Sequence, residues 1–510
     1  MNLQIGLIGK HVGIESILRQ EGLPYRLIVE IDDLNVSDYA LLICLGNFSL
    51  DPQKISNYLA NGGAVLFDST SYAKLKNLKF KKRKVNFLTP NSAEFLHVGL
   101  VDIYSKISIV KSESLKVVDA GLKIQKFKNN AIVIPFDIDN LLFDSRIKRK
   151  RFIAEREELA SERVSVVSKA GVRKILLRCL EMLFEARNLP MVQKWYFPKL
   201  PKTHFIFRVD TDFCDEKEAN DLLAICRKHN IIGSWFVDTK QTERLKNCYS
   251  KMIDQEIGLH CFQHLVFDDY AKNKENIDAG KANLDKANIT YHGFVSPLGE
   301  WNTNLEKALV DTGFLYSSEF GFDYDNLPSV QKNGDRTILQ IPIHPISTGR
   351  MRRSHFSMDE MIAYYKKVID EKVKNHELIV FYHHPGHPHL PVFDKVFAYI
   401  NKLDIPTSTM MQFASWWKKR DEIEINPTYE NDVIKLDSTP HINIRIYYKN
   451  KETVVAAKNR ITLTELDFTV VNKTVDDEKR ARQFHWRDLL YDYETAKGKR
   501  FTKKKIEEEK

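Results

Sequence analysis

The chain has 510 residues, of which 43% are hydrophobic and 28% charged. At roughly 100–200 residues per domain, this length predicts about three domains that can bury ordinary cores. The formal net charge of +9 is modest for such a length, so we expect no nucleic-acid partner. Two basic runs, Lys81–Lys84 and Arg146–Arg151, are typical of a solvated surface, and attraction to a phosphate-bearing substrate or to lipid headgroups is the alternative.

The opening residues and the cysteines bear on location. Met1–Gly9 turns polar too early for a signal peptide, and no stretch approaches the roughly 20 apolar residues that span a bilayer. The six cysteines are scattered without a Cys-x-x-Cys pair, as in proteins that keep reduced, buried thiols. We therefore expect a cytoplasmic protein without a transmembrane segment, and no feature indicates an oligomeric state.

Residues 1–145 are predicted to form a doubly wound α/β domain. A helix begins at Asp51-Pro52 and stops at Gly62-Gly63. The apolar runs of strand type around it are Leu3–Ile8, Arg26–Glu30, Tyr39–Cys44 and Ala64–Phe67. The stretch Leu50–Phe67 resembles the class I glutamine-amidotransferase-like fold. Cys44 lacks the glycine-flanked elbow of that group's catalytic members, so we expect a buried strand residue in a non-catalytic domain.

Residues 146–200 are expected to be a helical linker, because 150–188 are rich in Glu, Arg, Leu and Ala. Residues 201–422 return to alternating strands and helices, with helices such as Glu216–His229 and Met358–Val373. The strand candidates are His204–Val209, Ile231–Val237, Ile257–Leu259, His292–Val295, Phe314–Ser317, Ile338–Ile343 and Leu378–Tyr382. Seven repeats predict a distorted, seven-stranded (β/α) barrel with its chemistry at the C-terminal strand ends.

The remaining residues change character. Residues 423–495 contain β-type runs, among them His441–Tyr448 and Thr453–Ala456, and predict a small β-rich domain. Residues 496–510 are a charged tail that we expect to be frayed or disordered.

Two aspartates follow the first predicted barrel strand, in Arg208-Val209-Asp210-Thr211-Asp212. On a regular strand, residues two apart share a face. Two like charges there are costly unless a proton or a cation lies between them. A pair of solvated loop aspartates is the alternative interpretation.

Two histidines follow the strand Ile257–Leu259, in Gly258-Leu259-His260-Cys261-Phe262-Gln263-His264. Their four-residue spacing places them on one face of a helical turn and recurs in zinc sites, although such a pair alone is often a surface accident. With an aspartate at another strand end they form a sharper set. Three protein ligands plus open water positions describe a catalytic divalent-metal site.

With these motifs, residues 203–420 resemble the polysaccharide deacetylases, the family with the NodB homology domain (carbohydrate esterase family 4). The resemblance implies that Asp210 is the catalytic base and that Asp212, His260 and His264 are the metal ligands. A set of two histidines and one aspartate fits zinc, and it also accepts cobalt, nickel or manganese.

The family's third motif resembles Val295-Ser296-Pro297-Leu298-Gly299-Glu300-Trp301-Asn302. An ordinary loop turn is the alternative for its Pro-x-Gly part. The resemblance implies a wall of the substrate groove, with the Leu298 N–H binding the oxyanion. The implied substrate-binding residues are Pro297, Leu298, Gly299, Trp301 and Asn302. The family has an arginine where this chain has Val295, and that arginine braces the base; Arg208, Arg350 or Arg352 could replace it.

The strand Leu378–Tyr382 leads into a histidine-rich loop, His383-His384-Pro385-Gly386-His387-Pro388-His389. The resemblance implies a histidine here that protonates the leaving group. We favour His384, which precedes a proline, over His383. His387 and His389 are expected to be loop or groove residues, with a second metal at this loop as an alternative.

The sequence therefore predicts a metal-dependent hydrolase that removes an N-acyl group, acetyl first, from an amino sugar. Without a signal peptide, the expected substrate is a cytoplasmic glycan intermediate or a surface-polysaccharide precursor. One alternative is an inactive deacetylase fold that binds glycan or serves as a scaffold, which Val295 favours. The other is an amidohydrolase of another small C–N bond, for which the same metal chemistry would serve.

Overall fold

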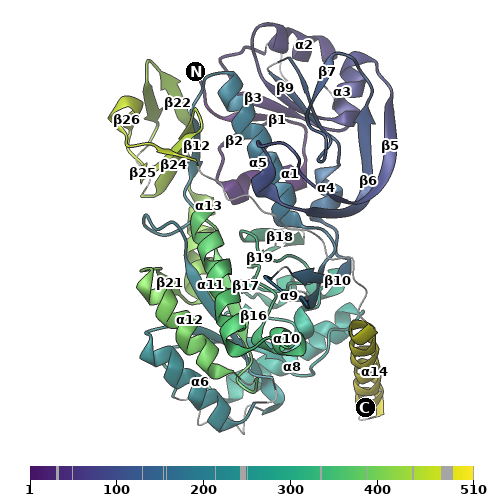
Figure 1. Ribbon diagram of the computed structural model, residues 1–510, viewed down its shortest axis with the longest axis vertical. Coiled ribbons are helices and arrows are strands. Elements are labelled where there is room, and N and C mark those ends of the chain that lie inside the picture. Colours follow the sequence, from purple (N-terminus) through teal and green to yellow (C-terminus); the bar gives the residue numbers. More distant parts are fainter. Residues whose placement is uncertain are drawn as a thin grey trace.

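The computed structural model describes residues 1–29, 34–48, 50–128, 130–152, 154–156, 158–212, 214–241, 249, 251–333, 336–387, 389–438, 441–471 and 486–508. Figure 1 shows two α/β units toward the two ends of the long axis, with small β-sheets beside the first unit and a terminal helix beside the second. No helix within the described residues has both the length and the apolar character needed to cross a membrane.

The first unit is built on a sheet with the strand order β2-β1-β3-β4-β9-β8-β7, here called the N-terminal sheet. Its strands are β1 (Ile5–Ile8), β2 (Tyr25–Ile28), β3 (Leu41–Cys44), β4 (Val65–Asp68), β7 (Leu115–Asp119), β8 (Ile124–Phe127) and β9 (Ala131–Ile134). The first five in this order are parallel, and β8 and β7 complete an antiparallel edge. The helices are α1 (Val12–Glu21), α2 (Pro52–Ala60), α3 (Ser69–Lys76) and α4 (Ile138–Leu142). The four strands and the helix predicted from the sequence are all present.

The start of α2 and the burial of Cys44 agree with the predictions from the sequence. The Asp51 carboxylate accepts a hydrogen bond from the Gln53 N–H at 2.9 Å and so begins α2. Cys44 is buried in β3, and burial raises the pKa of its thiol. The five cysteines that the structure describes are buried and form no disulfide with one another, and Cys248 lies outside the described residues.

An antiparallel ribbon, β5 (Phe80–Leu88) and β6 (Val101–Val110), extends the first unit, and a 3-10 turn, η1 (Leu96–Val98), lies between the two strands. The basic run Lys81–Lys84 lies on β5 with all four side chains exposed, which agrees with a solvated face.

The prediction of a helical linker over residues 146–200 is wrong for the first part of that segment. The strands β10 (Ile147–Phe152) and β11 (Ala160–Ser165) pair antiparallel, and among the described residues of this segment only α5 (Lys169–Ala186) is helical. The long charged side chains favour a helix by propensity, but tertiary ion pairs outweigh this preference. Lys150 is buried with its Nζ 3.0 Å from an Asp102 carboxylate oxygen, and Glu162 is buried against Arg350.

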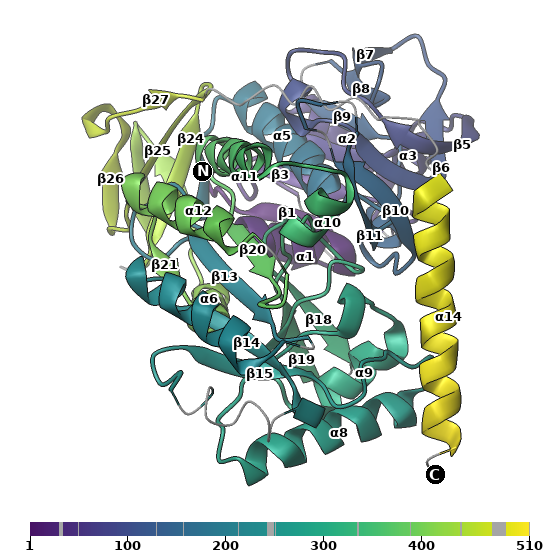
Figure 2. The same cartoon turned by 60° about the horizontal axis from the view of Figure 1, so that its bottom comes forward.

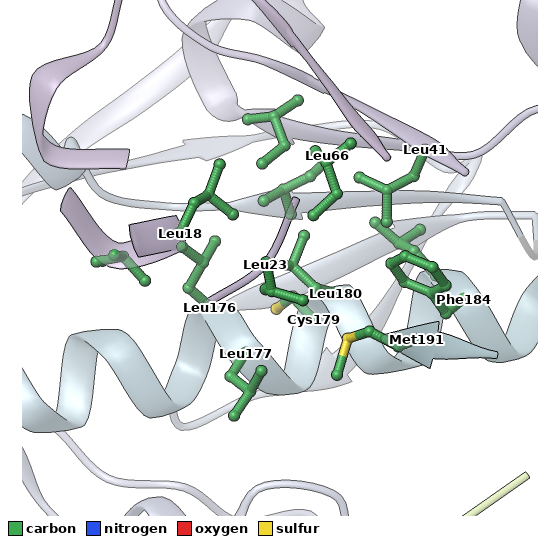
Figure 3. Close-up of a cluster of buried hydrophobic side chains, with 14 of the residues drawn as sticks. Leu18, Leu23, Leu41, Leu66, Leu176, Leu177, Cys179, Leu180, Phe184 and Met191 are labelled. Carbon is green, nitrogen blue, oxygen red and sulfur yellow. The ribbon is translucent and has the colours of Figure 1, made fainter. Parts of the chain in front are cut away.

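The buried face of α5 packs against the N-terminal sheet, where Leu176, Leu180 and Phe184 meet Leu18 and Leu66 (Figure 3). The same core contains buried residues from the chain's C-terminal strands, among them Ile434, Ile444 and Tyr447.

The predicted β-rich appendage is therefore part of the first unit's core rather than a separate body. One small sheet has the order β12-β24-β25-β27, formed by β12 (Met191–Lys194), β24 (Asn443–Tyr448), β25 (Lys451–Ala456) and β27 (Thr469–Val470). The other consists of β22 (Pro427–Glu430), β23 (Val433–Leu436) and β26 (Arg460–Thr462), followed by η4 (Leu463–Glu465).

The chain's last described residues also differ from expectation. Residues 486–495, expected in the β-rich domain, and the tail to 508 form one helix, α14 (Trp486–Glu508). Acidic side chains near its start pair with arginines of β10, and these contacts fix a segment whose composition alone suggests disorder. Residues 509 and 510 lie outside the described part.

The second unit is a curled sheet that we call the second sheet, with the order β18-β19-β17-β16-β15-β14-β13-β20 and β21 beside β13. All seven predicted strands are present and parallel: β13 (Phe205–Asp210), β14 (Gly233–Asp238), β15 (Glu256–Cys261), β16 (Gly293–Phe294), β17 (Tyr316–Ser317), β19 (Arg336–Gln340) and β20 (Ile379–His383). The additional strands are β18 (Ser329–Asn333), antiparallel to β19, and β21 (Thr407–Ser408). Among the described strands no ladder joins β19 to β20, so the barrel stays open; one backbone hydrogen bond, from the His344 N–H to the Val380 carbonyl (2.8 Å), crosses the gap.

Helices surround the curled sheet. They are α6 (Glu216–Lys228), α8 (Tyr270–Lys286), α9 (Thr303–Thr312), α10 (Thr348–Arg353), α11 (Met358–Lys374), α12 (Leu390–Lys402) and α13 (Met410–Glu422), with the 3-10 turns η2 (Thr239–Gln241) and η3 (Pro297–Gly299). This arrangement brings the carboxyl ends of the parallel strands to one edge, where the predicted motifs lie.

Candidate active site

The first aspartate of the motif is held by a neighbouring arginine. Asp210 ends β13 and is buried. Arg208 Nε and Nη2 donate to its two carboxylate oxygens, each at 2.7 Å, while Arg208 Nη1 donates to the Ser318 carbonyl at 2.6 Å. Such a bidentate ion pair fixes both the position and the plane of a carboxylate. Of the three arginines that could replace the one missing at Val295, Arg208 is therefore the one that braces Asp210.

The second aspartate meets the two histidines. Asp212 Oδ1 is 2.7 Å from His260 Nε2, and Asp212 Oδ2 is 3.1 Å from His264 Nε2. The three ligand atoms lie within 4.8 Å of one another, and in the described part of the chain they form the one such group of three or more. The predicted metal ligands are thus brought together from the carboxyl ends of β13 and β15, which lie on either side of β14.

The donors of this group fit a divalent cation. Nδ1 of the buried His260 lies 3.0 Å from the Val295 carbonyl, which accepts its proton and leaves Nε2 with a lone pair. Neither His260 Nε2 nor Asp212 Oδ1 completes a hydrogen bond with any described residue, although both are buried. Two acceptors that face each other in this way require a positive charge between them. Three protein ligands with an open position are the usual set for a catalytic zinc site.

A proton is the other charge that can lie there. Burial opposes the charged form of His260, but the Asp212 carboxylate outweighs burial and raises the pKa of His260 to about 9. Burial likewise opposes ionisation of Asp212, and the two histidines overcome it and hold the pKa of this carboxyl well below its usual range. The group therefore concentrates charge where a cation would displace a proton.

His383 ends β20 and His384 follows it, and their side chains point to different surroundings, as those of adjacent residues in an extended chain do. His384 Nε2 lies 3.5 Å from Asp212 Oδ2, beside the metal ligands. His383 is fully buried, with Nδ1 3.2 Å from Thr348 Oγ1 and its ring 4.7 Å from that of Phe393. The structure brings His384 to the site and leaves His383 in the packing between helices.

The remaining histidines of the loop do not form a second metal group within the described residues. The ring of His387 lies 4.4 Å from that of His384, and His389 precedes the first turn of α12. Pro388 lies outside the described residues.

The third motif forms a tight turn, η3. Leu298 and Gly299 both have positive φ, 59° and 62°. A Cβ at Gly299 would meet the Phe320 ring at about 2.3 Å, so this position requires glycine. The Leu298 side chain is 37% exposed and lines a small pocket with Glu300 and Arg350. Pro297, Leu298 and Gly299 therefore form a rigid wall with one accessible residue.

Trp301 and Asn302, predicted to contact substrate, have structural contacts instead. Trp301 is buried, and its ring lies 4.9 Å from that of Phe322. The Asn302 side chain accepts from the Leu305 N–H at 2.8 Å, which caps α9, and donates to the Phe267 carbonyl at 2.9 Å. The apolar surface of an indole gains more from burial here than from the groove.

Sequence reasoning did not find Glu319. Its Oε1 accepts a hydrogen bond from the Ser296 N–H at 3.1 Å and so holds the η3 loop. Burial raises the pKa of Glu319 to about 7. Its place two residues after β17 was the available signal, because the other site carboxylates also follow strand ends.

Comparison with known proteins adds the following. No protein-family model and no curated protein sequence matches the chain. Among solved structures, a candidate polysaccharide deacetylase from Mycobacterium smegmatis has 16% identity, covers 47% of this chain and 98% of its own, and has a TM-score of 0.39. An allantoinase has 16% identity, coverage of 44% and 93%, and a TM-score of 0.38. A carbohydrate esterase family 4 pseudoenzyme from Bacillus anthracis has 12% identity, coverage of 53% and 90%, and a TM-score of 0.33.

Proposed function

We propose that this chain is a metal-dependent hydrolase that removes an N-acyl group, acetyl first, from an amino sugar of a cytoplasmic glycan or of a surface-polysaccharide precursor. One observation carries the proposal: Asp212 Oδ1 and His260 Nε2 are buried, face each other at 2.7 Å and lack hydrogen-bond partners among the described residues. Such a pair is costly to fold unless a cation or a proton lies between the two atoms, and a bound cation would displace the proton.

Asp212, His260 and His264 would hold the cation, with zinc as the first choice and cobalt, nickel or manganese as alternatives. The cation supplies Lewis-acid polarisation of the acyl carbonyl and a lower pKa for bound water. Asp210, oriented by Arg208, accepts the proton of the attacking water.

Two further groups act on the acyl and amine parts of the substrate. The Leu298 N–H, on the accessible wall of η3, stabilises the developing oxyanion. His384, beside Asp212, gives a proton to the departing amine. This role follows from position, because a general acid has to lie within hydrogen-bond reach of the leaving group that it protonates.

Two alternative functions make use of the same residues. The absent family arginine at Val295 favours an inactive glycan-binding or scaffold protein, but Arg208 supplies the bracing pair that this absence would remove. An amidohydrolase of another small C–N bond would need the same base, ligands and acid, so only the choice of substrate separates it from a deacetylase.

The first experiment measures acetate release from a panel of N-acetylated nucleotide sugars and oligosaccharides. It compares metal-loaded protein, chelated protein and D210N, with D394N as the matched control, because the half-buried Asp394 of α12 pairs with Lys228 outside the proposed site. We expect release that requires both metal and Asp210 and that D394N retains.

Metal content measured in parallel separates the alternatives. One metal per chain without acetate release, but with hydrolysis of a formamide or cyclic amide, would favour the amidohydrolase. One metal per chain without turnover of any of these substrates would favour the binding protein. Absence of stoichiometric metal in wild-type protein, at the same level as in H264A, would overturn the proposal.

A further inference from the structure

The terminal helix α14 lies beside the second unit, from the hairpin β10–β11 toward α8 (Figure 2). Its contacts run along its length: Asp488 and Asp492 pair with β10, Lys499 pairs with Glu300 of the η3 loop, and Lys503 pairs with Asp268 at 3.3 Å. The helix therefore contacts both the basic hairpin and the loop that carries Leu298.

Two carboxylates of α14 are held by two arginines of β10. Asp488 Oδ2 accepts from Arg151 Nη2 at 2.6 Å, and Asp488 Oδ1 accepts from Ser161 Oγ at 3.1 Å. The Asp492 carboxylate accepts from Arg149 through Nε at 3.2 Å and through Nη2. These arginines belong to the basic run Arg146–Arg151, for which the deacetylase residues provide no role.

Between these carboxylates, Tyr491 lies among three guanidinium groups. The guanidinium carbons of Arg353, Arg350 and Arg149 are 3.9, 4.8 and 5.4 Å from the centre of its ring. Guanidinium groups favour both the faces of aromatic rings and the oxygens of phosphates. We call Arg149, Arg151, Arg350 and Arg353 the arginine cluster.

The arginine cluster adjoins the candidate active site. Arg350 and Tyr491 line the same small pocket as Leu298 and Glu300. A Cβ at the neighbouring Gly349 would come within 2.6 Å of the His387 ring, which itself lies 4.4 Å from the His384 ring. A ligand bound at the cluster would therefore extend toward the proposed acid and the η3 wall.

We propose that the arginine cluster binds the nucleoside diphosphate part of the substrate, and that α14 occupies this site as an internal competitor. The helix presents an aromatic ring flanked by two anionic groups, and a nucleoside diphosphate presents an aromatic base joined to two phosphates. The cluster offers cationic faces for the ring and forked N–H donors for the anions. The inference rests on the proposed function, because it identifies the substrate of that same groove as a nucleotide-linked sugar.

The test uses the full chain, free of metal and of turnover, so that a failed deacetylase assay leaves its outcome intact. Uridine diphosphate is titrated calorimetrically at fixed salt into wild type, D488N/D492N and E494Q; Glu494 is exposed on the same helix and serves as the matched control. We expect D488N/D492N to bind roughly 10-fold more tightly than wild type, because the competing charge-assisted bonds are lost, and E494Q to bind as wild type does. Hydrogen exchange in α14 should quicken when uridine diphosphate is added to wild type.

The arginine side is tested in the D488N/D492N background. Adding R353Q should weaken uridine diphosphate binding roughly 10-fold, whereas R352Q, an exposed neighbour on α10, should leave it unchanged. Thermal unfolding confirms that each variant is folded. Inorganic pyrophosphate that binds as tightly as uridine diphosphate would overturn the nucleoside assignment. No binding of uridine diphosphate to D488N/D492N, or binding unchanged from wild type, would overturn the site itself.

Discussion

Both parallel sheets place a carboxylate at the carboxyl end of a strand, but the surroundings of the two carboxylates differ. In the N-terminal sheet, Asp68 Oδ1 accepts hydrogen bonds from the Ser71 N–H at 2.7 Å and the Gly46 N–H at 3.1 Å and caps α3. In the second sheet, Asp212 Oδ1 faces His260 Nε2, and neither atom has a hydrogen-bond partner within the described residues. Buried polar atoms are nearly always paired in folded proteins. The unpaired atoms therefore distinguish Asp212, in the candidate site, from Asp68, which caps a helix.

The largest expected effect comes from His384, which follows β20, when it is compared with His383 at the end of that strand. H384Q should lower kcat on an N-acetylated substrate by roughly 10²–10⁴, because the leaving amine loses its proton donor. H383Q changes a neighbour that packs against Phe393 and should leave kcat near wild type once folded protein is quantified. Steady-state kinetics check both, and equal losses in the two variants would contradict the role given to His384.

The pair Arg208–Asp210 allows a stability test. R208M leaves the Asp210 carboxylate buried without its partner and should lower the free energy of unfolding by about 3–5 kcal/mol. R26M removes an exposed arginine from β2 of the N-terminal sheet and should change it by less than about 0.5 kcal/mol. Urea unfolding measures both values. Similar losses of unfolding free energy in the two variants would contradict the importance given to the buried Arg208–Asp210 pair.

A substitution that creates a cavity tests whether the first unit has one shared core. Ile444 in β24 is fully buried among residues of the N-terminal sheet and α5, so I444A should cost about 2–5 kcal/mol in unfolding free energy. V470A in the exposed strand β27 is the control, with a change below about 0.5 kcal/mol. Loss of stability confined to the C-terminal strands, with the N-terminal sheet unaffected in hydrogen exchange, would argue against one common core.

The smallest expected effect is a pH dependence at Glu319. Burial raises the pKa of this carboxyl from 4.5 to about 7, so the folded state binds the proton more tightly than the unfolded state. Its contribution to stability is therefore complete below pH 4.5 and is lost as the pH rises through about 7. E319Q cannot ionise, so its unfolding free energy relative to wild type should increase between these pH values. A difference that is constant with pH would contradict the assigned burial effect.

The sequence was most informative where one local pattern decides the outcome. All seven parallel strands of the second sheet are apolar runs between amphipathic helices, and the ligands Asp212, His260 and His264 directly follow such runs. The hairpin β10–β11 was misassigned because propensity favours a helix there, and the pairing of Lys150 with Asp102 is a tertiary contact.

Other features depend on residues that are distant in sequence. The contacts of Trp301 and Asn302 depend on Phe322 and Phe267, whose positions next to this loop are set by the tertiary fold. The docking of α14 depends on arginines of β10, far earlier in the chain, so composition alone suggested a disordered tail.

The strand β12 pairs with β24, and Met191 of β12 shares the first unit's core with Ile434 and Ile444. The second sheet, β13 to β20, lies between these partners in sequence. During synthesis the first unit consequently emerges with part of its core uncovered, and this core can be completed only after the whole second unit has been made. The second unit is thus an insertion within the first, and its folding determines when the N-terminal sheet can be completed.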